Sequence, residues 1–310
     1  MASVTKPRTR SAQAALATSP GDQRALVGGW TLVEPVHQGS LTAVYRARPS
    51  TSDADGDAVD AAYALKLLQP DWENNPAAQA LIQREAVIGR QAASPHLVSI
   101  LAAHTQAAPY YVVMPWLEGV SLAQLVERRG ALPAGLALWA ARQTAEALDA
   151  LHQCGWVHGD VKPANILLAH SGHATLVDLG FARRPGDLGT GLDRVAMGTP
   201  HYLAPECLCS QPRFDARSDL YALGVTLYEL LCGMPASSSH DHDAEDGQQA
   251  APRRCVDLRQ RAPWVSRDLA KLVACLTANE PLRRPQSAHE LVEELVSLEI
   301  DHLADRLPAA

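Results

Sequence analysis

Residues 158–168, His-Gly-Asp-Val-Lys-Pro-Ala-Asn-Ile-Leu-Leu, hold the side chains of this chain that are best suited to chemistry. A carboxylate (Asp160) is followed two positions later by an ammonium group (Lys162) and five positions later by a carboxamide (Asn165). Apolar residues flank this stretch on both sides, so we expect two short buried strands to hold it as a rigid loop. Phosphoryl transfer needs such a set, because it requires an acceptor for the nucleophile's proton, a cation near the transferred phosphate and an oxygen ligand for Mg²⁺. A plain polar turn between two apolar runs is the alternative interpretation of this stretch by itself.

Length and composition narrow the class of protein. The 310 residues can form one large domain or two lobes. The net charge of −7 argues against a general nucleic-acid-binding protein, which is usually basic. No run approaches eighteen uninterrupted apolar residues, so no membrane span is expected. Residues 1–27 lack the apolar segment of a secretory signal and are predicted to be a disordered tail. With only six cysteines, the chain fits a reducing compartment and a cytoplasmic location.

The first half of the chain is predicted to form a small β-rich lobe with one main helix. The helix is expected over residues 77–92, and a polar acidic loop over residues 48–60. Lys66 lies among apolar residues in the third expected strand, and Glu85 in the helix is a candidate partner for its charge. Apolar runs predict five strands, at Trp30–Val33, Ala43–Tyr45, Ala62–Leu68, Leu97–Leu101 and Tyr110–Met114.

The second half of the chain is predicted to be mainly helical. Residues 115–119, Pro-Trp-Leu-Glu-Gly, break the strand pattern and are predicted to be a hinge. Helices are expected at Leu122–Arg129 and Pro133–Gln153, and short strands at Ile166–Leu168 and Thr175–Val177. The second of these strands leads into Asp178-Leu179-Gly180. Further helices, a long loop over residues 181–206 and an acidic insert near residues 240–250 follow.

With these elements in order, residues 30–300 resemble the bacterial branch of the eukaryotic-like (Hanks-type) serine/threonine protein kinases. The resemblance rests on several separate motifs. These are Tyr63-Ala-Leu-Lys66, His158-Gly-Asp160, Asp178-Leu-Gly180, Gly198–Glu206, Ser218–Gly224 and Arg284. It implies an α+β, two-lobed protein-kinase fold with an N-lobe at residues 28–114, a hinge at 115–119 and a C-lobe at 120–305.

The resemblance also implies a role for each matching position. The catalytic residues would be Asp160 as the base, Lys162 on the γ-phosphate, Lys66 on the α- and β-phosphates and Glu85 as the partner of Lys66. The metal ligands for Mg²⁺ (or Mn²⁺) would be Asn165 and Asp178. The residues contacting ATP would be Gly39, Val44, Ala64, Lys66, Met114, Pro115, Leu117 and Leu167. In the C-lobe, Asp219 would brace the catalytic loop and Arg284 would pair with Glu206.

Two positions depart from the family pattern. The family usually has three glycines in the loop that covers the phosphates, whereas this chain has His37, Gly39 and Thr42 there. Backbone N–H groups approach phosphates most closely where no Cβ intervenes, so we expect a stiffer loop and weaker nucleotide affinity. At Gly159 the chain lacks the arginine that binds an activation-loop phosphate in the family.

Control by phosphorylation is therefore predicted to be weak. Residues 181–197 contain one threonine, Thr190, and no serine or tyrosine. Thr199 lies so near the catalytic residues that we expect it to be structural. The alternative stays open, because three arginines could still bind a phosphate: Arg183, Arg184 and Arg194.

The function that the resemblance implies is that of an ATP-dependent serine/threonine protein kinase, with a Ser- or Thr-bearing protein as substrate. Lys162 in the catalytic loop favours Ser or Thr over Tyr, and the chain could also phosphorylate itself. Two alternatives stay open. One is a pseudokinase scaffold with weak nucleotide binding, suggested by the loop that keeps only one of the three usual glycines. The other is a small-molecule kinase of the aminoglycoside type, because the His-Gly-Asp sequence also occurs in that family. The segments 198–206 and 218–224, which would form a peptide-binding shelf, favour a protein substrate.

Overall fold

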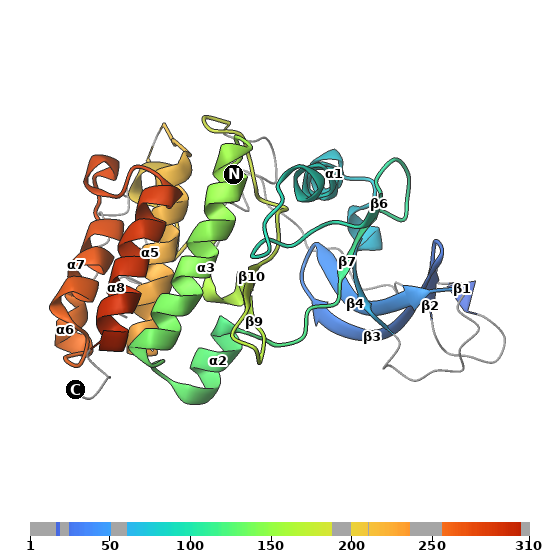
Figure 1. Cartoon of the computed structure of the whole chain (residues 1–310). Helices are drawn as coiled ribbons and strands as arrows, with labels where there is room; N and C mark the ends of the chain where they lie inside the picture. The colour runs from blue at the N-terminus through green and yellow to red at the C-terminus, as the bar shows by residue number, and fades with distance from the viewer. Residues whose placement is uncertain are drawn as a thin grey trace, which may run out of the picture. The chain divides into compact units, whose positions relative to one another are not determined.

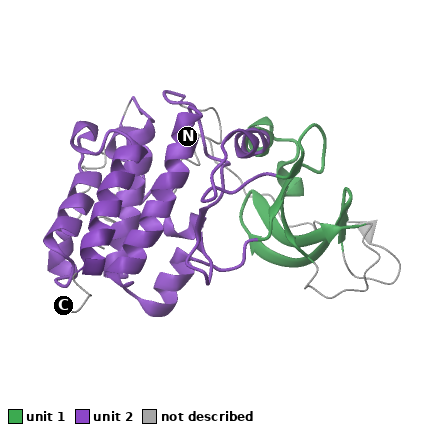
Figure 2. Cartoon of the chain, viewed as in Figure 1, with its two compact units in different colours: residues 1–82, 101–116 green, residues 83–100, 117–310 purple. Residues whose placement is uncertain are grey.

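The computed structural model describes residues 17–18, 25–50, 61–187, 200–209, 211–235 and 256–304. Several predictions lie outside these residues: most of the tail 1–27, most of the loop 48–60, Thr190, Arg194, Thr199 and the insert near 240–250. The chain divides into two compact units, coloured green and purple in Figure 2. Unit 1 contains residues 1–82 and 101–116, and unit 2 contains residues 83–100 and 117–310.

Unit 1 is built on an antiparallel sheet with the strand order β1-β2-β3-β4-β5-β7-β6 (Figure 1). Two short strands near the N-terminus, β1 (Ala17–Thr18) and β2 (Ala25–Val27), lie within the stretch predicted to be a tail. Val27 is buried in the core of the sheet, so the folded unit includes residues before 28. The other strands are β3 (Trp30–Gln38), β4 (Thr42–Pro49), β5 (Tyr63–Leu68), β6 (Ala102–His104) and β7 (Tyr111–Pro115).

The register of this sheet separates its two faces. Successive side chains on a strand point to opposite faces, and directly paired residues share a face. One face carries the apolar core of unit 1, which includes Ala47, Leu65, Leu67, Tyr111 and Val113. The intervening residues of β4, β5 and β7 therefore lie on the other face.

The predicted strand at Leu97–Leu101 is wrong. The strand that joins the sheet is β6, which begins at Ala102 and pairs with β7. Leu97 instead forms an isolated parallel bridge with Leu176 in unit 2, and Val98 N–H donates to the Leu176 carbonyl at 2.9 Å. The apolar residues predicted extended backbone here, but residues 97–100 belong to unit 2, and Leu97 pairs within that unit rather than with the sheet of unit 1.

Unit 2 is mainly helical (Figure 1). α1 (Pro76–Gln91) begins in unit 1 and ends in unit 2, and α2 (Leu122–Arg129) follows the predicted hinge. α3 (Ala134–Gln153) packs against both α5 (Ala216–Cys232) and α8 (Ala288–Ala304), while α7 (Arg267–Leu276) packs on α5 and the short α6 (Leu258–Arg261). α5 is buried on nearly every side, as expected for a helix that is apolar all round. None of the described helices combines the length and apolarity needed to span a bilayer.

A small sheet carries the polar loop of unit 2. Its strands are β8 (Val120–Ser121), β9 (Ile166–Leu168) and β10 (Ala174–Leu176), in the order β10-β9-β8 and antiparallel throughout. β10 packs against α3, so the loop between α3 and β9 is anchored at both ends. The predicted α+β class, with a β-rich part and a mainly helical part, is confirmed.

Candidate active site

The loop between α3 and β9 is anchored by one buried carboxylate. Asp219, in the first turn of α5, accepts hydrogen bonds from the backbone N–H of His158 at 2.7 Å and of Gly159 at 2.9 Å. These two bonds fix the backbone immediately before Asp160, so the predicted bracing role of Asp219 is confirmed. The His152 ring contributes a third contact, with Nε2 lying 2.8 Å from Asp219 Oδ2.

His152 is a contact of the anchoring carboxylate that sequence reasoning missed. It sits in the last turn of α3, six positions before His158, and nothing in the local pattern sets it apart from a helix-terminal histidine. Its partner Asp219 is distant in the sequence, so only the folded chain reveals the contact.

Two side chains of the loop, those of Lys162 and Asn165, contact Asp160. The Lys162 ammonium lies 2.7 Å from Asp160 Oδ2. The Asn165 amide nitrogen donates to Asp160 Oδ2 at 2.9 Å and to the Asp160 carbonyl at 2.8 Å. Both partners of this nitrogen are acceptors, so Asn165 Oδ1 must point away from Asp160. Asp160 is only 4% exposed, and burial strengthens its pairing with the lysine.

Backbone contacts of the preceding residue, Val177, join Asp178 to the loop that carries Asp160. The Val177 N–H donates to the Asn165 carbonyl at 2.9 Å, and the His158 ring lies 3.3 Å from the Val177 carbonyl. Asp178 itself has a φ of +68°, which is uncommon for a residue other than glycine. Strained backbone of this kind clusters at functional sites, where the surrounding contacts enforce it. The structure thus joins the segment carrying Asp178 to the loop carrying Asp160 and Asn165.

The backbone at Gly159 adopts a left-handed conformation that favours glycine. Its φ is +78°, and a Cβ at this position would lie 3.0 Å from the Phe181 carbonyl and 3.7 Å from Arg183 Nε. Arg183 is buried beside this position, with its guanidinium 4.4 Å from the centre of the Phe214 ring. Its neighbour Arg184 donates to the carbonyls of the turn after α3 instead, at 2.9 and 3.1 Å.

A buried ion pair fastens the end of the segment that begins at Gly198. The Arg284 guanidinium donates to both carboxylate oxygens of Glu206, at 2.7 and 2.8 Å. Ser218 at the start of α5 donates to the same carboxylate at 3.1 Å. The predicted pairing of Arg284 with Glu206 is therefore confirmed. Paired forks of this kind hold two segments in a fixed orientation as well as neutralising charge.

Two further polar groups of this segment are too weakly acidic to act as nucleophiles. Burial raises the pKa of Cys207 to about 12, so the thiol stays protonated and unreactive at neutral pH. Burial also raises the pKa of Tyr202, and its hydroxyl donates to Glu229 at 2.5 Å. The chemistry of the site therefore rests on the carboxylate, ammonium and amide groups around Asp160.

Four of the residues predicted to contact nucleotide, Val44, Ala64, Lys66 and Met114, share one face of the sheet of unit 1. Val44 pairs directly with Lys66, and Ala64 pairs directly with Met114. Alternation along β5 puts Ala64 and Lys66 on the same side, opposite the core of unit 1. Gly39 lies at the tip of the β3–β4 hairpin.

The remaining predicted site residues are spread over both units. Pro115 ends β7 in unit 1, whereas Leu117 belongs to unit 2 and Leu167 lies in the middle of β9. Glu85 is buried on α1, in the part of the helix that belongs to unit 2. Lys66 belongs to unit 1, so its pairing with Glu85 stays a prediction.

Residues 30–296 match the model of the protein kinase domain. The chain belongs to the protein kinase family. It is 36% identical to the serine/threonine-protein kinase PknD of Mycobacterium tuberculosis over 267 residues, which are 85% of this chain and 39% of PknD. It is 32% identical over 246 residues to PknB of the same organism, covering 75% of this chain and 38% of PknB. A probable serine/threonine-protein kinase of Clostridium perfringens, CPE1738, is 29% identical over 279 residues, 88% of this chain and 38% of that protein. The chain thus spans about two-fifths of the length of these curated relatives.

The kinase-family residues fit a divalent metal held jointly with a nucleotide. Mg²⁺ is usually bound through one or two carboxylates and substrate phosphates rather than by a cage of protein ligands. Asn165 Oδ1 points away from Asp160, and the residue before Asp178 is hydrogen-bonded to the backbone of Asn165, so an amide oxygen and a carboxylate are available from two joined segments. Within the described residues there is no cluster of three or more His, Cys, Asp or Glu side chains that could hold a metal by itself.

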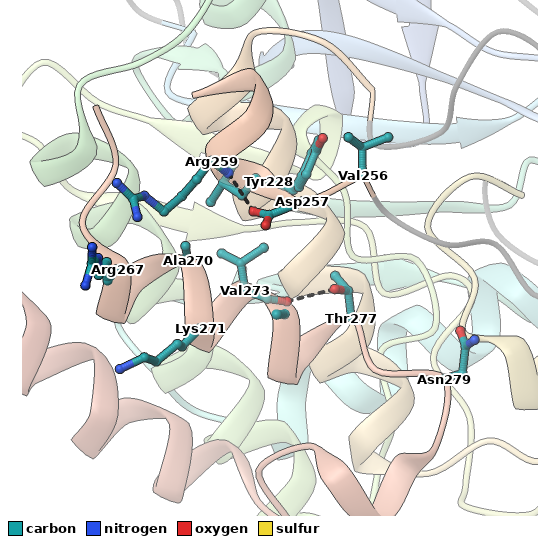
Figure 3. Close-up of a pocket in the computed structure, with 12 residues that line it drawn as sticks. Tyr228, Val256, Asp257, Arg259, Arg267, Ala270, Lys271, Val273, Thr277 and Asn279 are labelled. Carbon is teal, nitrogen blue, oxygen red and sulfur yellow. Dashed lines mark hydrogen bonds between the residues drawn. The ribbon is translucent and has the colours of Figure 1, made fainter. Parts of the chain in front are cut away.

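A separate hollow in the helical unit has no part in this site. It has a volume of about 560 Å³ and is lined by residues from the end of α5, from α6 and from α7 (Figure 3). Figure 3 shows Arg259, Arg267 and Lys271 on one side of it. Lys271 is already paired with Asp268 at 2.7 Å, and no residue of the loop 158–165 lines the hollow.

Proposed function

We propose that this kinase-family chain is an ATP-dependent serine/threonine protein kinase, which transfers the γ-phosphoryl group of Mg-ATP (or Mn-ATP) to a Ser or Thr hydroxyl of a protein. The observation that carries the proposal is the Asp160 carboxylate, which lies 2.7 Å from the Lys162 ammonium and 2.9 Å from the Asn165 amide nitrogen, on a loop anchored by buried Asp219. Catalysis of phosphoryl transfer is mostly positioning and charge stabilisation, and a loop anchored in this way supplies both.

In the proposed mechanism Asp160 accepts the proton of the attacking hydroxyl and orients the oxygen toward the phosphate. Lys162, which contacts the same carboxylate, supplies positive charge for the transferred group. Asn165 Oδ1 and the Asp178 carboxylate would hold the metal, which would neutralise phosphate charge when bound. Because the Asn165 amide also donates to Asp160, the proposed base and this proposed metal ligand are held in a fixed arrangement.

The nucleotide side of the proposal rests on unit 1. Lys66 would contact the α- and β-phosphates, and Val44 and Ala64 would contact the adenine from the same face of the sheet. The remaining proposed ATP contacts are Gly39, Met114, the Pro115 carbonyl, the Leu117 N–H and Leu167. Glu85 would orient Lys66, as the family resemblance implies.

The proposed substrate is a protein that presents Ser or Thr. PknB and PknD are named serine/threonine-protein kinases, which supports this substrate class. The Arg284–Glu206 pair also supports it, because it fastens the segment expected to form a peptide-binding shelf. The chain could also phosphorylate itself, and a cytoplasmic location stays a prediction from the sequence.

A transfer assay with radiolabelled ATP and Mg²⁺ tests the proposal. We expect wild-type protein to label Ser or Thr of a generic protein acceptor. Lys66→Ala and Asp178→Asn should each lower the rate by at least roughly a hundredfold, because each removes charge or positioning at the phosphates. The exposed Lys271→Ala is the matched control, since the ion-pair partner of Lys271 among the described residues is Asp268, also at the surface.

The same assay separates the alternatives. Tight binding of MgADP without transfer to any acceptor would support a pseudokinase scaffold. Transfer to an aminoglycoside but not to protein would support a small-molecule kinase. Wild-type turnover in Asp178→Asn would show that Asp178 is not a metal ligand.

A further inference from the structure

The tip of the β3–β4 hairpin is tied down through its carbonyl groups. The turn consists of Gly39, Ser40, Leu41 and Thr42, closed by a hydrogen bond from Gly39 N–H to the Thr42 carbonyl at 2.9 Å. Three consecutive carbonyls of this turn accept hydrogen bonds from the segment that follows β5. Gly39 accepts from the Gln69 side chain, Ser40 from the Trp72 indole at 2.9 Å, and Leu41 from the Gln69 backbone N–H at 2.9 Å.

The segment that makes these bonds, residues 69–75, is itself folded; we call it the strap. Its backbone closes three successive turns, with bonds of 2.9–3.2 Å from Trp72, Glu73 and Asn75 to carbonyls three residues earlier. Asn75 then caps α1, because its side chain accepts from the N–H groups of Ala77 at 3.0 Å and Ala78 at 3.2 Å. The strap is therefore anchored to β5 at one end and to a helix at the other, and it can hold the turn in place.

The direction of the carbonyls fixes the direction of the N–H groups. In a planar trans peptide the C=O and N–H of one unit point to opposite sides. The Gly39 and Ser40 carbonyls point at the strap, so the N–H groups of Ser40 and Leu41 point away from it. Among the described residues, neither of these two N–H groups has an acceptor. The turn thus presents adjacent backbone donors, and such concavities bind anions.

We propose that Gln69 and Trp72 are positioning residues for nucleotide binding, because they hold the Ser40 and Leu41 N–H groups ready to donate hydrogen bonds to phosphate oxygens. The strap would do by external support what flexible glycines do elsewhere in the family, since it fixes the turn before the nucleotide arrives. Preorganisation removes an ordering cost from binding. This inference rests on the proposed function for its ligand, a nucleotide polyphosphate, whereas the support of the turn by the strap does not depend on it.

The test uses the full chain with Trp72→Phe, Gln69→Met and the double variant. Trp72→Phe keeps an aromatic ring and removes only the indole N–H; Gln69→Met keeps the length of the side chain and removes the amide donor. Trp139→Phe is the matched control, because the Trp139 indole donates to another backbone carbonyl, that of Gly172, at 2.6 Å on α3. One readout is amide hydrogen exchange at Gly39 and Gln69 in nucleotide-free protein. The other is the split between KM for ATP and kcat.

We expect faster exchange at Gly39 and Gln69 in the two single variants and still faster exchange in the double variant. KM for ATP should rise roughly threefold to tenfold in each single variant, the effect of one hydrogen bond, and more in the double variant, with kcat within about twofold of wild type. Trp139→Phe should change neither readout. For protein that transfers no phosphate, MgADP affinity replaces KM.

Three results would overturn the inference. Equal exchange in wild type and the double variant would show that the strap does not hold the turn. Faster exchange with unchanged KM and unchanged MgADP affinity would show that the turn does not serve the nucleotide. An equal rise in KM for Trp139→Phe and Trp72→Phe would show a general effect of losing an indole donor. Wild-type protein without transfer would contradict the proposed function alone, because hydrogen exchange and MgADP binding still test the strap.

Discussion

Replacing Asp219 by asparagine should loosen the catalytic loop without unfolding the protein. Asp219 accepts from two backbone N–H groups, at 2.7 and 2.9 Å, and lies 2.8 Å from His152 Nε2. An asparagine has one oxygen, so its NH₂ group must face at least one donor. The change removes at least one hydrogen bond to a charged group, about 1.5–3 kcal/mol, and leaves a buried N–H without an acceptor, about 1–3 kcal/mol.

The expected loss of unfolding free energy is therefore about 2.5–6 kcal/mol, to be set against the roughly 5–15 kcal/mol that is typical of a domain. For a chain of this size each kcal/mol lowers Tm by roughly 2–4 °C, so the melting temperature should fall by roughly 5–24 °C. Transfer activity should fall as well, measured below the melting temperature, because the loop no longer fixes Asp160.

Asp215→Asn is the matched control for this prediction. Asp215 also accepts a backbone N–H at the start of α5, from Arg217 at 2.8 Å, but its side chain is 39% exposed. Asparagine caps helices about as well as aspartate, so this variant should melt within roughly 3 °C of wild type. If Asp219→Asn melted as close to wild type as the control does, the anchoring role of Asp219 would be refuted.

Three further predictions concern support and control. Arg284→Lys should lower the free energy of unfolding, measured in urea, by about 2–4 kcal/mol, because an ammonium group cannot form the two parallel hydrogen bonds that the guanidinium makes with Glu206. The control Arg283→Lys, at an exposed ion pair, should change it by less than about 0.5 kcal/mol. Equal effects of the two variants would contradict this prediction. Gly159→Ala should cost about 1–2 kcal/mol in the same measurement, since its φ is +78° and the Cβ meets the Phe181 carbonyl; an unchanged midpoint would speak against the strain. Thr190→Ala should keep most transfer activity, and phosphatase treatment should not abolish it; a tenfold loss that Thr190→Glu restores would show a phosphorylation switch.

Local features of the fold could be predicted because local pattern determines them. The helices α2 and α3 begin and end within a residue of their predicted bounds, where a serine or proline precedes them and a glycine follows. The loop from His158 to Asn165 was recognisable because its polar residues stand between two buried apolar runs. The pairing of Glu206 with Arg284 was predicted only through the family resemblance.

Features that depend on distant partners were not predictable in the same way. The residues 97–101 have the composition of a strand, but Leu97 pairs with Leu176 rather than with the sheet of unit 1. The strap was missed because Gln69 and Trp72 have no pattern that marks them as donors to a turn some thirty residues earlier. Side-chain hydrogen bonds of this kind arise from tertiary packing, which hydrophobic periodicity does not encode.

Replacement of Asp160 tests the proposed activity most directly. Asn at this position keeps the size of the side chain and removes the charge that pairs with Lys162 at 2.7 Å. With radiolabelled ATP, Mg²⁺ and a protein acceptor, we predict label on Ser or Thr for the wild type. We predict a rate at least roughly a hundredfold lower for Asp160→Asn, with the variant still folded by its melting curve. Equal rates in the two proteins would contradict the assignment of Asp160 as the catalytic base.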